Sequence, residues 1–309
     1  MKVLLGGGSG FLGSALAKAL GQAGHSVTFI SRRPSASITP SVGWDSGELV
    51  AAVEQSDAMI NLAGAPIAGR RWSKATRQAI LISRLSTTQA LAKALQSLHA
   101  QGRSQPGVWL NGSAIGFYPY GKGGKNEPEV DETAEGGNHF LAQVCQAWEG
   151  ATLAAADLGV RTVQLRTGLV LGRSGGALPL LALPFWWGMG GKMGPGTQWN
   201  AWIHLHDWVQ MVLWLLEHPT LSGAVNLVAP TPEMASTVAR GLGRVMRRPS
   251  LLPVPGWVLR LVLGEASETV LGSQRVVPQV AQQQGFEFCY PHLGPALTDL
   301  FAKTPSHPT

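Results

Sequence analysis

Residues 2–24 read KVLLGGGSGFLGSALAKALGQAG. The apolar run at residues 3–5 predicts a short buried strand, and residues 10–23 carry apolar side chains at helical spacing. Three glycines mark the turn between them at GxxGxxG spacing: Gly7, Gly10 and Gly13. A tight strand-to-helix turn, and a backbone that closely approaches a diphosphate, both need residues without a Cβ atom. The stretch therefore predicts a dinucleotide-binding fold, with a plain glycine-rich turn as the alternative in a chain with 39 glycines.

The rest of the chain repeats this alternation of strand and helix. Apolar segments predict strands at residues 27–31, 58–62, 108–111, 162–171 and 224–228, and helices at residues 73–98, 137–158 and 208–217. Alternating strands and helices argue for a parallel sheet that is covered on both faces. We therefore predict an α/β protein, a Rossmann doubly wound parallel sheet with a smaller C-terminal substrate lobe.

The character of the sequence changes after Gly172. Glycine, proline and tryptophan crowd residues 175–202, and a second proline-rich passage covers residues 228–257. We expect a Rossmann domain at residues 1–175, completed by about residues 205–230, and a smaller substrate lobe from residues 176–204 and 231–309. Residues 304–309 are expected to be a disordered tail.

The end of the second predicted strand selects between the two nicotinamide dinucleotides. An acidic residue there would accept the ribose 2′-hydroxyl of NAD, but the sequence has Ser31, Arg32 and Arg33. Two guanidinium groups suit a 2′-phosphate, so the sequence predicts NADP as cofactor. The alternative is an ordinary basic loop.

Composition excludes several other classes of protein. The charge of +6 comes from only 14% charged residues, and no basic run with interleaved aromatics suggests nucleic acid. Cys145 and Cys289 are the only cysteines and lie in no ligand-spaced cluster, so neither a metal site nor a disulfide framework is expected. No apolar stretch reaches the roughly 20 residues of a membrane span. We expect a soluble cytoplasmic protein without nucleic acid or membrane partners.

Further motifs resemble a known family. They follow in order along the chain at residues 7–13 (GGSGFLG), 61–64 (NLAG), 113–118 (SAIGFY), 165–172 (LRTGLVLG) and 202–207 (WIHLHD). This order is similar to that of extended short-chain dehydrogenases. Additional segments are similar to the atypical "epimerase family" proteins among them, at residues 70–72 (RRW), 83–85 (SRL), 145–149 (CQAWE) and 252–300. The resemblance covers nearly the whole chain.

The resemblance implies roles for particular residues. The glycine turn with Phe11 and Leu12 should hold the diphosphate, and Ser31 with Arg32 should meet the adenosine 2′-phosphate. The other implied cofactor contacts are Leu62, Ala63, Arg84 and Val170. Apart from the resemblance, the three apolar residues would be core in any sheet, and Arg84 would be a surface helix charge.

The usual catalytic residues of this family are missing. Such enzymes use a tyrosine with a lysine four residues later on one helix face, and a serine or threonine after the fifth strand. Alignment on Glu149 places Leu141 at the tyrosine position, Cys145 at the lysine position and Ala114 at the serine position, with Ser113 one residue early. A YxxxK match at residues 118–122 contains Pro119 and Gly121, so we expect it not to be helical.

Three residues remain as catalytic candidates: Cys145, Tyr118 and Ser113. A helix cysteine on an apolar face is more often a plain core residue, which is the alternative for Cys145, whereas Tyr118 would line the substrate pocket without being the usual acid. Further pocket candidates are Lys192, Trp199, Trp202 and His204, of which His204 is equally a structural histidine.

Two functions stay open at this point. The first is an NADP-dependent oxidoreductase or epimerase-like enzyme acting on a small, unidentified substrate. The second is a non-catalytic NADP(H)-binding scaffold or redox sensor, for which the missing triad is the motivating feature. A homodimer formed through the helices at residues 73–98 and 137–158 is a further expectation from the resemblance.

Overall fold

The computed structural model describes residues 1–33, 39–45, 47–67 and 71–302. Its strands are β1 (Lys2–Gly6), β2 (Ser26–Ser31), β3 (Ser41–Gly43), β4 (Ala58–Asn61), β5 (Val108–Ala114), β6 (Arg161–Thr167), β7 (Leu169–Leu171), β8 (Trp199–Asn200), β9 (Trp202–His204), β10 (Gly223–Leu227) and β11 (Glu233–Met234). Its α-helices are α1 (Phe11–Gln22), α2 (Glu48–Glu54), α3 (Lys74–Ala100), α4 (Phe140–Gly150), α5 (Leu153–Asp157), α6 (Leu178–Trp186), α7 (Leu205–Glu217), α8 (Ala235–Met246), α9 (Gly256–Leu263), α10 (Glu268–Leu271), α11 (Gln279–Gln283) and α12 (Leu293–Phe301). Two 3₁₀ turns, η1 (Ile115–Phe117) and η2 (Gly264–Ser267), complete the set.

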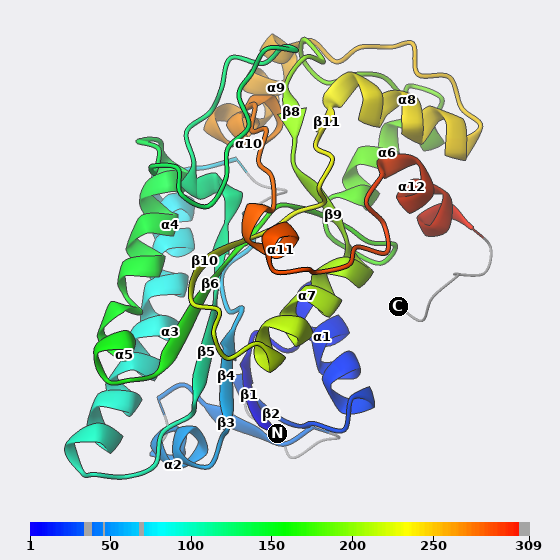
Figure 1. Cartoon of the computed structure of the whole chain (residues 1–309). Coiled ribbons are helices and arrows are strands. Elements are labelled where there is room, and N and C mark those ends of the chain that lie inside the picture. Colours follow the sequence, from blue (N-terminus) through cyan, green and yellow to red (C-terminus); the bar gives the residue numbers. More distant parts are fainter. Residues whose placement is uncertain (34–38, 46, 68–70, 303–309) are drawn as a thin grey trace.

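One seven-stranded sheet runs through the molecule (Figure 1). Its order is β10-β6-β5-β4-β1-β2-β3, and every neighbouring pair is parallel. The chain therefore winds outward from β1 in both directions, which is the doubly wound Rossmann arrangement predicted from the sequence. The order reverses between β1 and β4, the point at which such sheets leave a crevice at their carboxyl ends.

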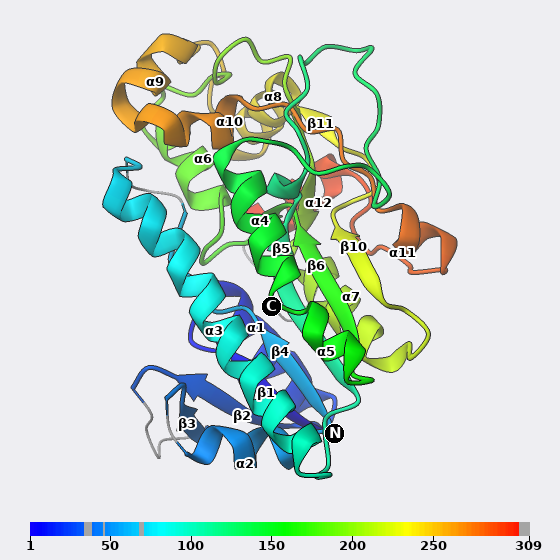
Figure 2. The same ribbon diagram turned by 90° about the vertical axis from the view of Figure 1, so that its left-hand side faces the viewer.

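Helices cover both faces of the sheet (Figure 2). On one face α1 and α7 pack against the strands, and their shared core contains Leu16, Leu20 and Trp208. On the other face α2, α3 and α5 pack with Leu95, Leu98 and other apolar side chains against the same strands. Both faces of the inner strands are buried. Their sequences are therefore mainly continuous runs of apolar residues and do not alternate between apolar and polar residues.

The structure confirms most elements predicted from the sequence and corrects two of them. The apolar run at residues 162–171 is not one strand: β6 ends at Thr167, and β7 leaves the sheet to pair with β9. The predicted helix at residues 137–158 is two helices, α4 and α5. The YxxxK match at residues 118–122 is not helical, as expected from its proline and glycine.

The remaining elements gather where the strands of the sheet end. Two small β-ladders, β7 with β9 and β8 with β11, lie there with helices α6, α8, α9, α10 and α12 (Figure 1). The predicted division into a Rossmann domain and a substrate lobe stays a prediction. The tail at residues 304–309 lies outside the described residues. Among the described residues, no helix combines the length and the apolar character needed to cross a bilayer.

Candidate cofactor and substrate site

The glycine turn between β1 and α1 leaves no room for side chains. Gly7 has a positive φ of 82°, and a Cβ atom on it would lie 2.8 Å from the Leu62 carbonyl carbon. A Cβ atom on Gly13 would overlap the carbonyl oxygen of Gly7, and one on Gly8 would enter the ring of Phe29. Among the described residues no side chain caps the start of α1 at Gly10. The turn is thus a bare backbone cradle at a helix N-terminus, which fits the diphosphate of a dinucleotide.

The end of β2 presents basic side chains on the same side of the molecule as this turn. Ser31 closes the strand, and its hydroxyl oxygen accepts a hydrogen bond of 3.1 Å from the Arg33 amide. Arg32 and Arg33 are both exposed. The β1–β2 pairing places Gly6 opposite Ile30, so the two loops that follow these strands start side by side.

A cavity of about 370 Å³ opens beside the glycine turn. Leu12, the ends of β4, β5 and β6, helix α4 and the segment around α10 form its wall. It therefore lies at the carboxyl ends of the central strands, the usual ligand position in open α/β sheets. Its lining is mainly apolar, and Arg84 is the only charged side chain in the described part of the wall.

The residues that occupy the positions of the family's catalytic triad line this cavity. Leu141 and Cys145 lie one turn apart on α4, and both are buried in the wall next to Ser113 and Ala114. Burial raises the pKa of the Cys145 thiol to about 11, and the Glu149 carboxylate adds to the rise. The thiol is therefore protonated at neutral pH. The Ser113 hydroxyl donates a 2.6 Å hydrogen bond to Glu149, which turns it toward the interior.

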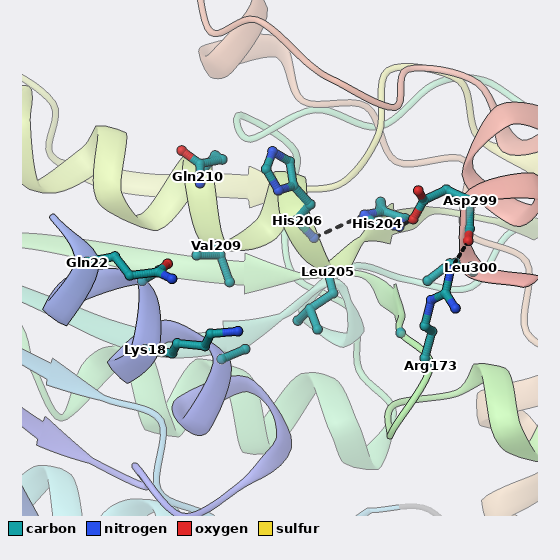
Figure 3. Close-up of a pocket in the computed structure, with 13 residues that line it drawn as sticks. Lys18, Gln22, Arg173, His204, Leu205, His206, Val209, Gln210, Asp299 and Leu300 are labelled. Carbon is teal, nitrogen blue, oxygen red and sulfur yellow. Dashed lines mark hydrogen bonds and ion pairs between the residues drawn. The ribbon is translucent and has the colours of Figure 1, made fainter. Parts of the chain in front are cut away.

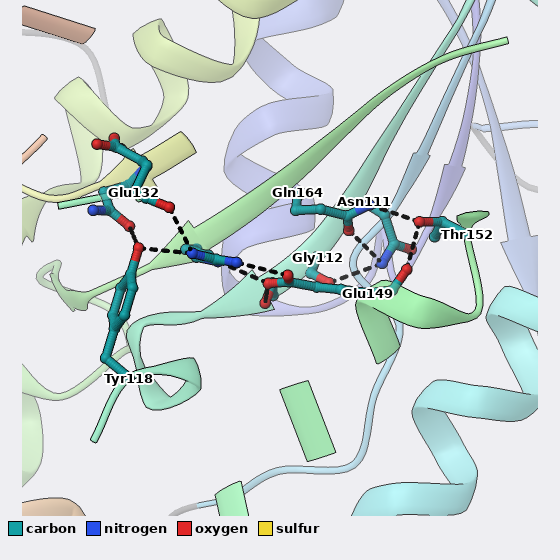
Figure 4. Close-up of polar contacts among 10 residues, drawn as sticks. Asn111, Gly112, Tyr118, Glu132, Glu149, Thr152 and Gln164 are labelled. Atoms are coloured by element: carbon teal, nitrogen blue, oxygen red, sulfur yellow. Dashed lines mark hydrogen bonds and ion pairs between the residues drawn. The ribbon is translucent and has the colours of Figure 1, made fainter. Parts of the chain in front are cut away.

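Tyr118 lies outside the described wall of this cavity, and its role in a substrate pocket stays a prediction. It is fully buried, and its hydroxyl donates to the Asn226 side chain at 2.8 Å and accepts from Arg166 at 2.9 Å. Burial raises its pKa to about 12. Arg166 also forms a two-pronged ion pair with Glu149, both bonds at 2.9 Å (Figure 4). Tyr118 thus belongs to a buried polar network behind the site.

Arg84 reaches the cavity from α3, and it is not a surface charge. Its guanidinium donates to the backbone oxygens of Ala65 and Ile80 and lies 5.0 Å from the centre of the Trp148 ring. Burial lowers the pKa of this side chain. Gly64 allows the close approach, because a Cβ atom there would lie 3.0 Å from the guanidinium carbon.

The apolar cofactor candidates divide into two groups. Leu62 lines the cavity with Leu12, and its backbone and that of Ala63 touch Gly7. Val170 is buried in the core between the sheet and α7, outside the described cavity wall. Phe11 packs its ring against the loop at residues 172–176, where three glycines leave room for it. Their roles in cofactor binding stay predictions.

Several wall residues gave no signal in the sequence. Tyr120, Asn200, Thr269 and Gln274 come from loops and short elements far apart along the chain. Gln274 donates to the backbone oxygens of Ile115 and Tyr118, which ties the C-terminal segment to the end of β5. Of the aromatic candidates, Trp199 lines the cavity, whereas Trp202 is buried in another cluster.

His204 lies in a second, smaller cavity of about 100 Å³ between α1, α7 and α12 (Figure 3). Its Nδ1 accepts from the His206 amide at the start of α7, and its Nε2 lies 3.4 Å from an Asp299 carboxylate oxygen. Tyr290 stacks on the imidazole at 4.0 Å. These contacts fit the structural role that the sequence left as an alternative, and the role of His204 stays a prediction. Lys192 is exposed and does not reach the large cavity.

One cluster has the ligand types of a metal site. Polar atoms of His206, Asp207 and Cys289 all lie within 4.8 Å of one another. The two Asp207 carboxylate oxygens accept hydrogen bonds from the backbone amides of Cys289 and Tyr290, at 3.0 and 2.8 Å. These bonds fix the C-terminal segment against α7, so a structural role accounts for the acidic member of the cluster.

Comparisons with known proteins agree with this geometry. Residues 3–227 match the NAD dependent epimerase/dehydratase family, and residues 254–300 match a domain of unknown function, DUF1731. An epimerase family protein of Mycobacterium leprae is 37% identical over 300 residues, which cover 96% of this chain and 94% of that protein. The crystal structure of the human epimerase family protein SDR39U1 with NADPH superposes with a TM-score of 0.88 at 35% identity, covering 98% of this chain and 100% of that one. A nucleoside-diphosphate sugar epimerase from Corynebacterium glutamicum gives a TM-score of 0.76 at 30% identity, covering 97% of this chain and 58% of that one.

The fold and the glycine turn define the class: an extended Rossmann protein with a dinucleotide cradle beside an apolar cavity. Within that class, the chain belongs to the NAD dependent epimerase/dehydratase family. The family resemblance drawn from the sequence motifs is thereby confirmed. Arg70, one of those motif residues, lies outside the described residues.

Proposed function

We propose that this protein binds NADP(H) and transfers a hydride to or from a small, uncharged, mainly apolar substrate. The observation that carries the proposal is the continuity of the site. The bare glycine cradle leads through Leu12 and Leu62 into the apolar cavity, and the exposed Arg32 and Arg33 stand at the neighbouring strand end. The NADPH in the human relative's structure supports the choice of cofactor.

The cavity wall favours an uncharged substrate. A nucleotide sugar brings two phosphates, which proteins bind with free guanidinium groups, ammonium groups or helix N-termini. Arg84 is the only charged side chain in the described wall, and backbone oxygens already accept hydrogen bonds from it. The wall otherwise offers apolar surface and a few hydroxyl and amide groups, which suits an apolar carbonyl compound or alcohol.

NADPH supplies a hydride when bound, and the protein must then supply a proton to the substrate oxygen. Cys145 is the candidate donor, because its thiol carries a proton and lies in the wall one helical turn from Leu141, which stands where the family has its tyrosine. General-acid catalysis contributes about a hundredfold or more in rate. If Cys145 is the donor, Cys145→Ala should lower the single-turnover rate by about that factor with little change in NADPH affinity.

The proposal is tested by single-turnover oxidation of protein-bound NADPH, followed by absorbance, with a panel of apolar aldehydes and ketones beside nucleotide sugars. We expect oxidation with at least one apolar carbonyl compound and none with the sugars. Turnover with nucleotide sugars alone would contradict the substrate assignment.

A second function has a specific observation in its favour. Leu141 and Cys145 replace the tyrosine and lysine of the family, so the site lacks the usual acid, which suits a non-catalytic NADP(H)-binding scaffold or redox sensor. Tight NADPH binding without oxidation across the whole panel would favour this reading. A cytosolic location and a homodimer through α3 and α4 stay predictions.

A further inference from the structure

Exposed apolar side chains concentrate on one part of the molecule. Ten of the thirteen exposed large apolar side chains among the described residues come from two segments, residues 180–189 and 251–262. We call these ten the tryptophan surface: Leu180, Leu183, Trp186, Trp187, Met189, Leu251, Leu252, Trp257, Leu261 and Val262, each more than half exposed. Soluble monomers rarely expose so large an apolar group of side chains without a binding role.

The two segments form one continuous region. The Leu252 amide donates to the Gly190 carbonyl at 3.1 Å, and the Val254 amide donates to Lys192 at 2.9 Å. The segment that follows α6 therefore pairs with the segment that precedes α9. Figure 2 shows α6 and α9 near each other on the same side of the molecule.

Helix α9 presents three of its apolar side chains outward. Its sequence, GWVLRLVL, has one charged residue, Arg260, yet none of its residues is buried. Trp257, Leu261 and Val262 are all exposed. A helix of this composition normally packs its apolar face into a core, so the described part of the chain leaves this face uncovered.

The two stretches of chain that carry the tryptophan surface contain charges of a single sign. Residues 174–206 and 234–264 contain no aspartate or glutamate. They carry exposed cations at Lys192, Arg244, Arg247, Arg248 and Arg260. The acids that border these ranges along the chain are the buried Asp207, the half-buried Glu233 and the exposed Glu265, and Glu265 pairs with Arg77 at 2.6 Å. An apolar surface surrounded by cations can bind a partner that has an apolar interior beneath an anionic surface.

In place of the expectation from composition that the protein has no membrane partner, we infer that the tryptophan surface docks on an anionic phospholipid bilayer. Tryptophan and leucine side chains enter the interface between headgroups and acyl chains, and arginines near an anionic leaflet add electrostatic attraction. A second copy of this chain fits less well, because a twofold interface would set these cations against one another. Helix α10, which follows α9, contributes Thr269 to the large cavity, so docking brings that wall of the cavity toward the bilayer.

Vesicle co-sedimentation of the full chain tests this inference. We expect the protein to bind vesicles in which roughly a third of the phosphatidylcholine is replaced by phosphatidylglycerol. Binding should be weaker to pure phosphatidylcholine and should fall as salt rises, because screening weakens the attraction between the arginines and the lipid. The double variant Trp186→Ser/Trp257→Ser and the double variant Arg247→Glu/Arg248→Glu should each lower the partition coefficient by about tenfold or more.

The matched control is the double variant Ile82→Ser/Leu153→Ser, which removes exposed apolar side chains from α3 and α5, outside the tryptophan surface. It should bind vesicles like the unchanged protein. Circular dichroism confirms that each variant is folded. The inference is overturned if folded protein ignores anionic vesicles, or if all three variants bind equally. It is also overturned if sedimentation shows a dimer, or a complex with an acidic protein, that the tryptophan variant dissociates while vesicles do not bind.

Discussion

At the scale of single residues, the glycine turn is the part of the site that tolerates least change. Gly13 faces Gly7 so closely that a Cβ atom would overlap the Gly7 carbonyl oxygen, and that carbonyl accepts the hydrogen bond from Gly10 that shapes the turn. Gly21 lies on the same helix, and a Cβ atom there would meet nothing within 4 Å. Alanine at Gly13 therefore tests the geometry of the cradle, and alanine at Gly21 controls for the general effect of adding a methyl group to α1.

We predict that Gly13→Ala weakens NADPH binding by about tenfold or more, because the turn must open to admit the methyl group. Gly21→Ala should leave binding unchanged and stabilise α1 by about 0.5–1 kcal/mol, since alanine favours helix over glycine. Fluorescence titration with NADPH and urea denaturation of both variants provide the check. Equal loss of NADPH affinity in the two variants would mean that the diphosphate does not bind at this turn.

Selectivity between the two dinucleotides depends on the residues after β2. The double variant Arg32→Ala/Arg33→Ala should weaken NADPH binding by about tenfold or more and change NADH binding little, because only NADPH has the 2′-phosphate that a guanidinium can pair with. Arg240→Ala, which removes an exposed arginine from α8, should change neither. Titration of each protein with both nucleotides measures the effect, and equal weakening of both would refute the assignment.

At the scale of elements, the apolar pattern of the sequence predicts that a helix or strand exists, but contacts with distant residues determine where some of these elements end. Sequence periodicity predicts α1, α3 and α7 and six strands of the main sheet, since their apolar positions repeat clearly. It misses the end of β6, because the apolar run continues through Gly168. Gly168 allows a close approach there, because a Cβ atom on it would lie 2.6 Å from Val228 and 2.7 Å from the Ala201 carbonyl oxygen, which are distant in sequence.

The break between α4 and α5 has a similar origin. The Thr152 hydroxyl donates to the Glu149 carbonyl oxygen at 2.7 Å and accepts from Gln164 of β6 at 2.6 Å. A side-chain bond of this kind competes with helix continuation. Its partner lies on another element, so single-sequence periodicity could not reveal it.

The buried pair between Arg166 and Glu149 joins β6 to α4, and it should matter for stability. Arg166→Met leaves a buried carboxylate without its partner, so we expect a loss of about 3–5 kcal/mol in the free energy of unfolding. Arg103→Met breaks an exposed pair with Glu54 and should leave the denaturation midpoint almost unchanged. Urea denaturation at neutral pH compares them. A loss below about 1 kcal/mol for Arg166→Met would show that the network contributes little.

At the scale of the whole molecule, polar contacts fix the C-terminal segment to the Rossmann sheet. The local sequence pattern does not predict these contacts. Arg173 donates to the backbone oxygens of Asp299 and Ala302 at the end of α12, and His204 lies against the Asp299 carboxylate. The sequence predicted the cofactor cradle from one motif. It could not predict the large cavity, because its wall joins residues from α1 to the segment after α10 that meet only in the folded chain.

His204 should make folding sensitive to pH. Burial lowers its pKa to about 4 in the folded protein, against the usual 6.5 of histidine, although Asp299 partly opposes the shift. The unfolded chain therefore takes up a proton first as the pH falls, so the stability contributed by the neutral imidazole is present above pH 6.5 and is lost between 6.5 and 4. The loss amounts to about 3 kcal/mol.

The variant His204→Asn separates this effect from the titration of carboxylates. Asparagine keeps an acceptor at the start of α7 and does not titrate. Urea denaturation from pH 7 to pH 4.5 should therefore show a flatter loss of stability in the variant than in the unchanged protein. Parallel curves for the two proteins would remove His204 as a cause.

The central claim is that a nicotinamide dinucleotide phosphate lies with its diphosphate on the turn between β1 and α1. Isothermal titration calorimetry of the purified full chain with NADPH and NADH tests it most directly. We predict saturable binding of one NADPH per chain, about tenfold or more tighter than NADH because of the arginines after β2. Absence of measurable binding of either nucleotide by the folded protein would contradict the account.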